Sequence, residues 1–234
     1  MIFNNRYYSP YSLSLNVIRK IGRHFFTPKV FALFKIIQKL PKQARVLDVG
    51  AGTGGFLQIM EQANQCIETF GIDIGTPPNF MSKGIFIRGD IFHLPFQDNS
   101  FDLITCSHVI EHLSDSFHAV AELKRICKPN GYIYVETPSH RSILMPIGVN
   151  FWDDPTHIRP YSRISLRKLF ETQNLDIIKD GVKRSFAGIF FGFPYMIIGK
   201  FLKDPMSRVI FPIYFFGLSV YILGKKSPII EEKI

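Results

Sequence analysis

Cysteines are few in this sequence, and their spacing argues against two classes of site. The 234 residues include only Cys66, Cys106 and Cys127, and none of them forms a Cys-x-x-Cys pair. This spacing indicates neither a zinc site nor a disulfide framework. The N-terminus also lacks an uninterrupted apolar stretch, because Asn and Arg residues interrupt it, so no signal peptide is expected. We therefore expect a cytoplasmic protein.

A long hydrophobic run is also missing. A membrane-spanning helix needs about 20 apolar residues, whereas the two most apolar stretches, 186–199 and 209–223, are shorter, and Pro212 interrupts the second. The whole segment 186–216 is nevertheless strongly apolar, with only four charged residues. We expect this insert to dock peripherally on the inner face of a membrane. A lid over an apolar substrate and a homodimer interface are the alternatives.

Acidic residues are absent from the first 45 residues, which contain nine Lys and Arg. Residues 46–140 hold five basic and eleven acidic residues, and residues 141–234 hold fourteen and eight, so the net charge is +9. Basic flanks around an acidic middle favour an anionic partner: a membrane surface, nucleic acid or a phosphorylated substrate. Solvated Lys and Arg on surface helices are the alternative interpretation.

Residues 1–44 are predicted to form a basic helical extension. Apolar residues follow helical spacing in Leu13–Arg23, and a second helix begins at Thr27, a suitable N-cap, followed by Pro28. Pro41 ends this second helix. Residues 45–226 are expected to form the main domain, and 227–234 a tail.

Strands and helices alternate from residue 45 onward. Strands are expected at 45–49, 68–74, 84–88, 101–107, 132–137 and 175–182. Helices are expected at 55–63, 116–128 and 165–174, with a turn at 128–131 and Ser165 as an N-cap. This alternation predicts an α/β fold with a mostly parallel, doubly wound sheet and helices on both faces.

A glycine-rich turn, Asp48-Val-Gly-Ala-Gly-Thr-Gly54, joins the first strand to its helix. Glycines at alternate positions allow a tight turn and a close approach of a ligand to the backbone. Such a turn alone fits several nucleotide-like ligands. Asp73 follows about 20 residues later at the end of the next strand, where a carboxylate can accept both hydroxyls of a ribose. Asp90 and Ile91, after the third strand, are placed to hold an adenine ring.

These motifs, together with Leu94–Phe96, Phe101–His112 and Arg125–Tyr132, resemble the class I S-adenosylmethionine (SAM)-dependent methyltransferases, in particular the broad ubiquinone-type and small-molecule group. The resemblance implies seven strands in the order 3-2-1-4-5-7-6, with strand 7 antiparallel. Residues 218–225 fit that last strand, which makes 186–216 an insert between strands 6 and 7.

The resemblance also implies roles for individual residues. SAM is the implied cofactor, with Gly50, Gly52 and Gly54 along its methionine portion and Asp48 holding the turn and the amino group of the ligand. The remaining residues expected at the cofactor are Asp73, Ile74, Asp90, Ile91, Ser107 and His108.

Histidine suits the removal of a proton from an acceptor hydroxyl or amine, because its ordinary pKa lies near neutrality. We expect His157, in a polar loop rich in turn-forming residues, and His112, beside Glu111, to contribute to catalysis. Packing roles for these histidines are the alternative.

His108, Glu111 and His112 are spaced i, i+3 and i+4, which would place them on one helical face. With His157 they could form a metal site of three histidines and one glutamate, and the sequence leaves this question open. The favoured function is methyl transfer to an oxygen or nitrogen of a small or lipid-linked acceptor. RNA ranks lower, because most aromatic residues lie in apolar runs rather than among basic ones. An inactive SAM-binding or membrane-associated module is the third alternative.

Overall fold

The computed structural model describes residues 33, 35–76, 79–80, 82–145, 150–183, 190, 193–194, 196–197 and 213–228. The predicted helix Leu13–Arg23, the beginning of the second predicted helix, most of the apolar insert and the end of the tail lie outside these residues. Helical residues at 33 and 35–37 belong to the second predicted helix.

Seven strands form one sheet in the order β3-β2-β1-β4-β5-β7-β6, as the resemblance implied. The first five strands are parallel, and β7 runs antiparallel to both of its neighbours, β5 and β6. The fold class is therefore confirmed. The strand bounds are β1 Arg45–Val49, β2 Glu68–Asp73, β3 Ile85–Arg88, β4 Phe101–Ser107, β5 Cys127–Pro138, β6 Leu175–Val182 and β7 Ser219–Lys226.

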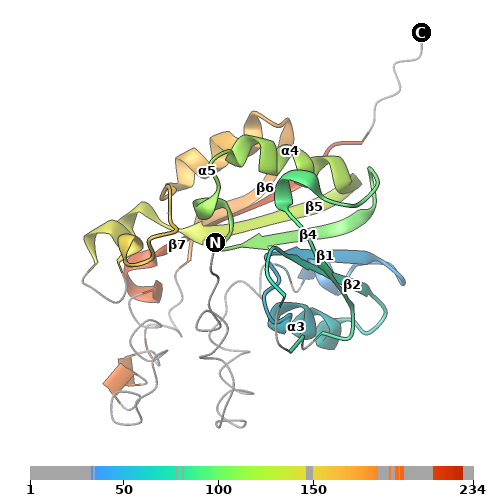
Figure 1. Cartoon of the computed structure of the whole chain (residues 1–234), viewed down its shortest axis with the longest axis horizontal. Coiled ribbons are helices and arrows are strands. Elements are labelled where there is room, and N and C mark those ends of the chain that lie inside the picture. Colours follow the sequence, from blue (N-terminus) through green and yellow to red (C-terminus); the bar gives the residue numbers. More distant parts are fainter. Residues whose placement is uncertain are drawn as a thin grey trace.

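Helices cover both faces of the sheet (Figure 1). Helices α4 (Ser116–Ile126) and α5 (Arg163–Glu171) lie on one face, and α3 (Gly55–Ala63) lies on the other. Short helical turns connect them: η3 Ile91–His93, η4 Ile110–His112, η5 His140–Leu144, η6 Phe151–Asp153 and the π-helical η7 Ile213–Gly217. The carboxyl ends of the parallel strands thus meet the turns η3, η4 and η5 along one edge.

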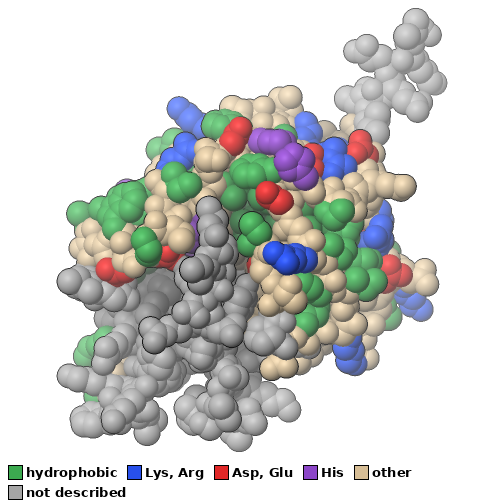
Figure 2. Space-filling view, in the orientation of Figure 1, with side chains coloured by type: hydrophobic (Ala, Val, Ile, Leu, Met, Phe, Trp, Pro, Cys, Tyr) green, Lys and Arg blue, Asp and Glu red, His purple; other side chains and the backbone are tan. Residues whose placement is uncertain are grey.

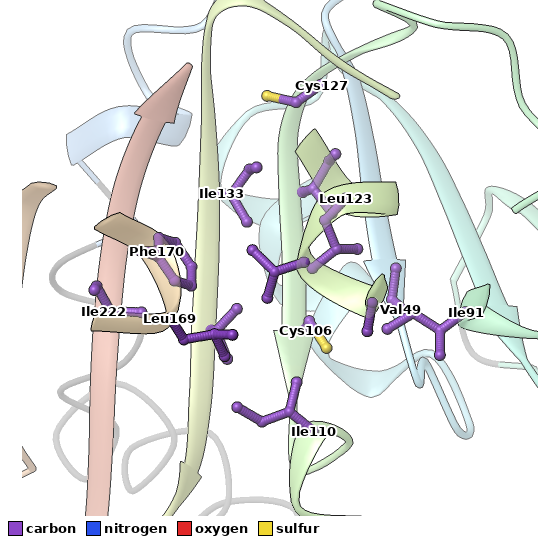
Figure 3. Packing of buried hydrophobic residues seen from close by; sticks show 14 of the residues in the cluster. Val49, Ile91, Cys106, Ile110, Leu123, Cys127, Ile133, Leu169, Phe170 and Ile222 are labelled. Atoms are coloured by element: carbon purple, nitrogen blue, oxygen red, sulfur yellow. The ribbon is translucent and has the colours of Figure 1, made fainter. Parts of the chain in front are cut away.

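The larger core lies between the sheet and the layer of α4 and α5. Leu123 from α4 and Leu169 and Phe170 from α5 pack against Ile133 and Ile222 of the sheet (Figure 3). A second core on the α3 side includes Leu33 and Ile37. Burial of these apolar side chains on both faces accounts for the near-continuous apolar strands of the sequence.

Three local predictions were wrong. Ser162, not Ser165, caps α5, because the Ser162 side chain accepts a hydrogen bond from the Ser165 backbone N–H and the helix begins at Arg163. The predicted turn at 128–131 is instead part of β5, which pairs with β4 through a register shift; Asn130 there has a φ of 65°. The helix predicted to reach Lys128 ends at Ile126.

The described part of the chain contains no helix that is both long enough and apolar enough to cross a membrane. Parts of the 186–216 insert are described, and several of their apolar side chains are exposed: Phe190, Phe193, Ile197, Phe215 and Phe216.

Candidate functional site

The glycine-rich turn has the geometry that its sequence requires. Gly50, Gly52 and Gly54 have φ angles of 74°, 50° and 75°, a region that favours glycine over other residues. A Cβ at Gly50 would overlap the Val109 side chain, and one at Gly54 would lie 2.6 Å from Cε2 of Phe80. Glycine is therefore required at both positions by the backbone angle and by close packing within the protein.

Asp73 lies beside this turn at the carboxyl end of β2. Its Oδ2 accepts a hydrogen bond from the Gly52 N–H (2.9 Å), and its Oδ1 accepts one from the Gly75 N–H (2.9 Å). The turn itself is anchored to β2, because the Gly50 and Ala51 N–H groups donate to the carbonyl oxygen of Ile72. The backbone thus fixes the carboxylate next to the glycines, as a ribose site would require.

The next predicted adenine contacts lie one strand further along the same edge. The Gly89 N–H donates to the carbonyl oxygen of Asp73 (2.9 Å), which joins the ends of β2 and β3. Asp90 caps η3 by accepting from the Phe92 N–H (3.0 Å). Ile74 is exposed, whereas Ile91 is buried in the core. Contacts of these side chains with an adenine stay predictions.

Asp48 and Ser107 stand at the ends of the two central strands. Asp48 is buried, and its Oδ1 accepts a hydrogen bond from the Thr105 hydroxyl (2.6 Å). The Ser107 Oγ is buried and makes no hydrogen bond. Buried polar atoms are rarely left without a partner, so the Ser107 hydroxyl fits a site that is completed by a ligand.

His108 follows Ser107 and lies between two buried glutamates. Its Nδ1 is 3.4 Å from Glu111 Oε1, and its Nε2 is 3.6 Å from Glu136 Oε1. Desolvation lowers the pKa of His108, but the two carboxylates outweigh this effect and raise the pKa to about 9. The ring is therefore a cation at neutral pH, with its charge directed at the glutamates. Its contact with a cofactor stays a prediction.

Glu111 is fully buried and links the end of β4 to β5. Its Oε2 accepts a hydrogen bond from the Thr137 hydroxyl (3.0 Å). Burial raises the pKa of this carboxyl, but the neighbouring His108 outweighs that effect and the net shift is downward. Glu111 is therefore ionised at neutral pH.

The loop after β5 is held against the same strand end by backbone hydrogen bonds. The N–H groups of Ile158 and Arg159 donate to the Glu111 carbonyl oxygen at 2.8 and 3.3 Å. This contact brings His157 beside His112, with 4.7 Å between their ring centroids. His157 also stacks on Phe151, at 4.4 Å between centroids. The two histidines predicted for catalysis are therefore neighbours.

The hydrogen-bond partners of the two rings determine which nitrogen stays available. His157 Nδ1 lies 2.6 Å from the Phe151 carbonyl oxygen, which can only accept, so Nδ1 donates and Nε2 has the lone pair of the neutral ring. The Thr156 hydroxyl donates to Asp154 Oδ1 (2.6 Å) and accepts from His112 Nδ1 (2.9 Å). His112 therefore also presents its Nε2.

His112 stays neutral around neutral pH. Partial burial lowers its pKa, Glu111 raises it, and His157 lowers it, with a net downward shift. A neutral imidazole with a free nitrogen can accept a proton or bind a metal.

Three of the four predicted metal ligands lie together. One ligand atom each from Glu111, His112 and His157 falls within 4.8 Å of the others. The helical face predicted to include His108 is wrong, because η4 begins only at Ile110 and His108 precedes it with a φ of 56°. The His108 ring is a cation held by carboxylates and is not part of this group.

A buried charge cluster that was not predicted from the sequence lies next to this group. Glu136 accepts hydrogen bonds from the Tyr134 hydroxyl (2.9 Å) and from Lys183 Nζ (2.9 Å). Burial, followed by the adjacent Glu136, raises the pKa of Tyr134. A single glutamate within the apolar strand run Tyr132–Thr137 is the signal that could have revealed it, because a buried charge needs partners.

A separate hollow of about 650 Å³ lies at the amino ends of β2 and β3, lined by Glu61, Thr69 and Gly84 among others. Ligands of open α/β sheets bind at the carboxyl ends of the strands. The turn, Asp73 and the histidines all lie at that opposite edge, so we place the functional site there.

Comparison with known proteins identifies the family of this chain. A methyltransferase domain model matches residues 22–180. An uncharacterized methyltransferase of Bacillus subtilis, YcgJ, is 32% identical over 146 residues, which cover 56% of each chain. A demethylmenaquinone methyltransferase of Roseiflexus castenholzii is 32% identical over 100 residues, covering 40% of this chain and 42% of that protein. The chain thus spans about half the length of the curated relatives it matches.

A solved structure of a SAM-dependent methyltransferase from Archaeoglobus fulgidus has the same fold, with a TM-score of 0.59 and 23% identity; the alignment covers 88% of this chain and 98% of that one. The domain match covers more than half of the sequence, and the strand order and the glycine turn agree with it. The chain belongs to the class I SAM-dependent methyltransferase family.

Proposed function

We propose that this protein transfers a methyl group from SAM to an oxygen or nitrogen of a small or lipid-linked acceptor close to a membrane surface. The observation that supports this most is the grouping along one sheet edge. Backbone-held Asp73 and the glycine turn lie on the donor side, and two histidines whose Nδ1 atoms are engaged in hydrogen bonds lie on the other side. We call these the donor half (the turn, Asp73 and Asp90) and the acceptor half (His108, Glu111, His112, Glu136, Lys183 and the 150–161 loop).

The donor half fits SAM. Its Asp73 carboxylate suits two ribose hydroxyls, and the glycines suit a ligand that approaches the backbone closely. The Ser107 hydroxyl, buried without a hydrogen bond, gives a polar group for the ligand. Bound SAM supplies a sulfonium whose methyl group is electrophilic.

The acceptor half supplies positioning and proton removal. An acceptor lone pair must point in line with the bond between sulfur and the methyl carbon, and holding it there provides much of the rate. As the new bond forms and the bond to sulfur breaks, a hydroxyl or amine acceptor loses a proton. The free nitrogens of His112 and His157 can favour that loss, either as bases or through a metal that they hold.

An apolar acceptor at a membrane fits the surface around the acceptor half. Leu144 and Trp152 are exposed, and η5 is joined to η7 by a hydrogen bond from Arg141 Nη1 to the Phe216 carbonyl oxygen (3.3 Å). Phe216 is also exposed. Two matched relatives are named for apolar acceptors, a demethylmenaquinone and a sterol.

RNA is the alternative acceptor. On the face in Figure 2, the described basic side chains are scattered among acidic ones and do not gather in one patch. Nucleic-acid binding relies on clustered Lys and Arg. The described residues of this face therefore give no support to the RNA alternative.

The test is transfer of isotope-labelled methyl groups from SAM to extracts separated into lipid, small polar and RNA fractions. We expect label in the lipid or small-molecule fraction. Label in RNA alone would replace this proposal by the RNA alternative. Full SAM binding without label in any fraction would favour an inactive module.

A further inference from the structure

Glu111, His112 and His157 bring three potential metal ligands to one point in the acceptor half. One ligand atom from each lies within 4.8 Å of the other two. Glu111 and His112 are consecutive, and the hydrogen bonds that tie the 150–161 loop to the Glu111 carbonyl oxygen bring the distant His157 to them. The backbone therefore maintains this meeting point.

The two rings are oriented as metal-binding histidines usually are. Each has its Nδ1 engaged in a hydrogen bond, His157 to a backbone carbonyl and His112 to a threonine that is itself held by Asp154. Such outer hydrogen bonds fix the tautomer and leave Nε2 for a metal. His157 Nε2 lies 3.9 Å from Asp154 Oδ2, too far for a hydrogen bond.

Glu111 adds an independent observation. Its side chain is fully buried, yet Oε1 accepts no hydrogen bond. It forms only an ion pair, with His108 Nδ1 at 3.4 Å. A buried carboxylate oxygen that accepts no hydrogen bond is incompletely satisfied, and a metal ion bound beside it would supply the missing interaction.

We propose that Glu111, His112 and His157 form a binding site for one divalent transition metal of the zinc, cobalt or nickel type. Two imidazoles and one carboxylate suit these ions, whereas Mg²⁺ and Ca²⁺ prefer sets of oxygen ligands. Three protein ligands leave at least one coordination position open, the pattern of catalytic rather than structural sites.

The spacing of the group is close to what one ion needs. Its ligand atoms lie within 4.8 Å of one another, and ligands bound about 2.1 Å from one ion are at most roughly 4.2 Å apart. The open position would bind an acceptor oxygen and favour its ionised form. That role rests on the proposed function, but metal binding itself does not.

The experiment titrates chelator-treated, full-length protein with Co²⁺ and follows the visible absorption bands of the ion, and it measures Zn²⁺ binding by calorimetry. We expect one ion per chain, and His157→Ala and His112→Ala each weakening binding at least 100-fold. Thr156→Val should weaken it about 10-fold or more, because it removes the partner that orients His112. Millimolar Mg²⁺ should not displace the Co²⁺.

His118→Ala is the matched control. His93 and His118 form another histidine pair, with ring centroids 6.2 Å apart, away from the proposed ligands. The proposal is overturned if the wild-type protein binds no ion, or if binding survives His157→Ala and is lost in His118→Ala. Circular dichroism establishes that each variant is folded. Unchanged SAM binding in a protein that takes up no metal would reject this site and leave the proposed function standing.

Discussion

The donor half and the acceptor half of the site are built in different ways. In the donor half, the key carboxylate is held by backbone N–H groups, and Gly52 and Asp73 are 21 residues apart. In the acceptor half, side chains hold one another across longer separations, 44 residues between His112 and Thr156 and 47 between Glu136 and Lys183. One half is thus a property of local turns, and the other is a property of the assembled sheet and loop.

The two halves also differ in the charges that they bury. The donor half buries one carboxylate, Asp48, which accepts a hydrogen bond from the Thr105 hydroxyl, whereas Asp73 is satisfied by N–H groups of adjacent turns. The acceptor half buries Glu111 and Glu136 and balances them with His108 and Lys183. Removing one member of such a group leaves another charge buried and unpaired, which is strongly destabilising. We therefore expect substitutions in the donor half to weaken SAM binding, and substitutions in the acceptor half to lower turnover or stability.

The largest effect is expected in the donor half. Asp73→Ala should weaken SAM binding about a thousandfold, since a carboxylate that accepts from two hydroxyls loses two charge-assisted hydrogen bonds of roughly 1.5–3 kcal/mol each. Calorimetry with SAM measures the change. Asp176→Ala is the control, because Asp176 is exposed near the amino end of β6. If the wild type and Asp73→Ala bind SAM with equal affinity, Asp73 does not hold the SAM ribose.

The next effect should fall on turnover and spare the cofactor. His157→Ala should lower kcat about 100-fold, the scale of a lost general base, while SAM affinity stays within a factor of two or so. Steady-state kinetics on the labelled acceptor, with calorimetry on SAM, separate these quantities. If SAM affinity falls in parallel with kcat, the two halves are not independent.

A smaller effect concerns stability and pH. The pKa of His108 is raised to about 9, above its ordinary value near 6.5, so its charged form is favoured in the folded protein. Its contribution to stability is complete below about pH 6.5 and is lost as the pH rises through about 9. Because the His108 side chain is half exposed, solvent screens part of this contribution, and the melting temperature of chelator-treated protein should fall by only about a degree or two over that window.

His108→Asn tests this assignment, because asparagine tolerates the positive φ of this position. The melting temperature of the variant should lie below that of the wild type near pH 6.5, and the two melting temperatures should converge near pH 9. If the melting temperatures of the wild type and the variant change in parallel with pH, His108 is not the titrating group.

The same contrast explains what could be predicted from the sequence. The Gly50–Gly54 turn could be predicted because positive φ angles and short spacings leave a local signature. The strand order followed only from the family resemblance that this turn and the later motifs carry. The partners of Glu111 could not be predicted, because they depend on where β5 and the 150–161 loop come to lie. Helical spacing failed at His108 for a local reason: its φ of 56° interrupts the helix before η4 begins.

The smallest predicted effect concerns the exposed part of the apolar insert. Phe190, Phe193 and Ile197 are exposed helical residues of the apolar insert. Replacing all three by serine should weaken binding to vesicles with anionic lipids about tenfold, because each exposed apolar side chain contributes only part of its full burial energy. Vesicle flotation measures the bound fraction.

The control for this change replaces Ile164 and Ile178, which are also exposed but belong to α5 and β6, by serine. These changes should leave vesicle binding unaltered. If both sets of variants float like the wild type, the insert does not dock on membranes, and a lid or dimer interface becomes the better explanation of its apolar surface. Sedimentation velocity then separates those two, because only a dimer interface would shift the wild-type protein to the mass of two chains and the serine variant back to one.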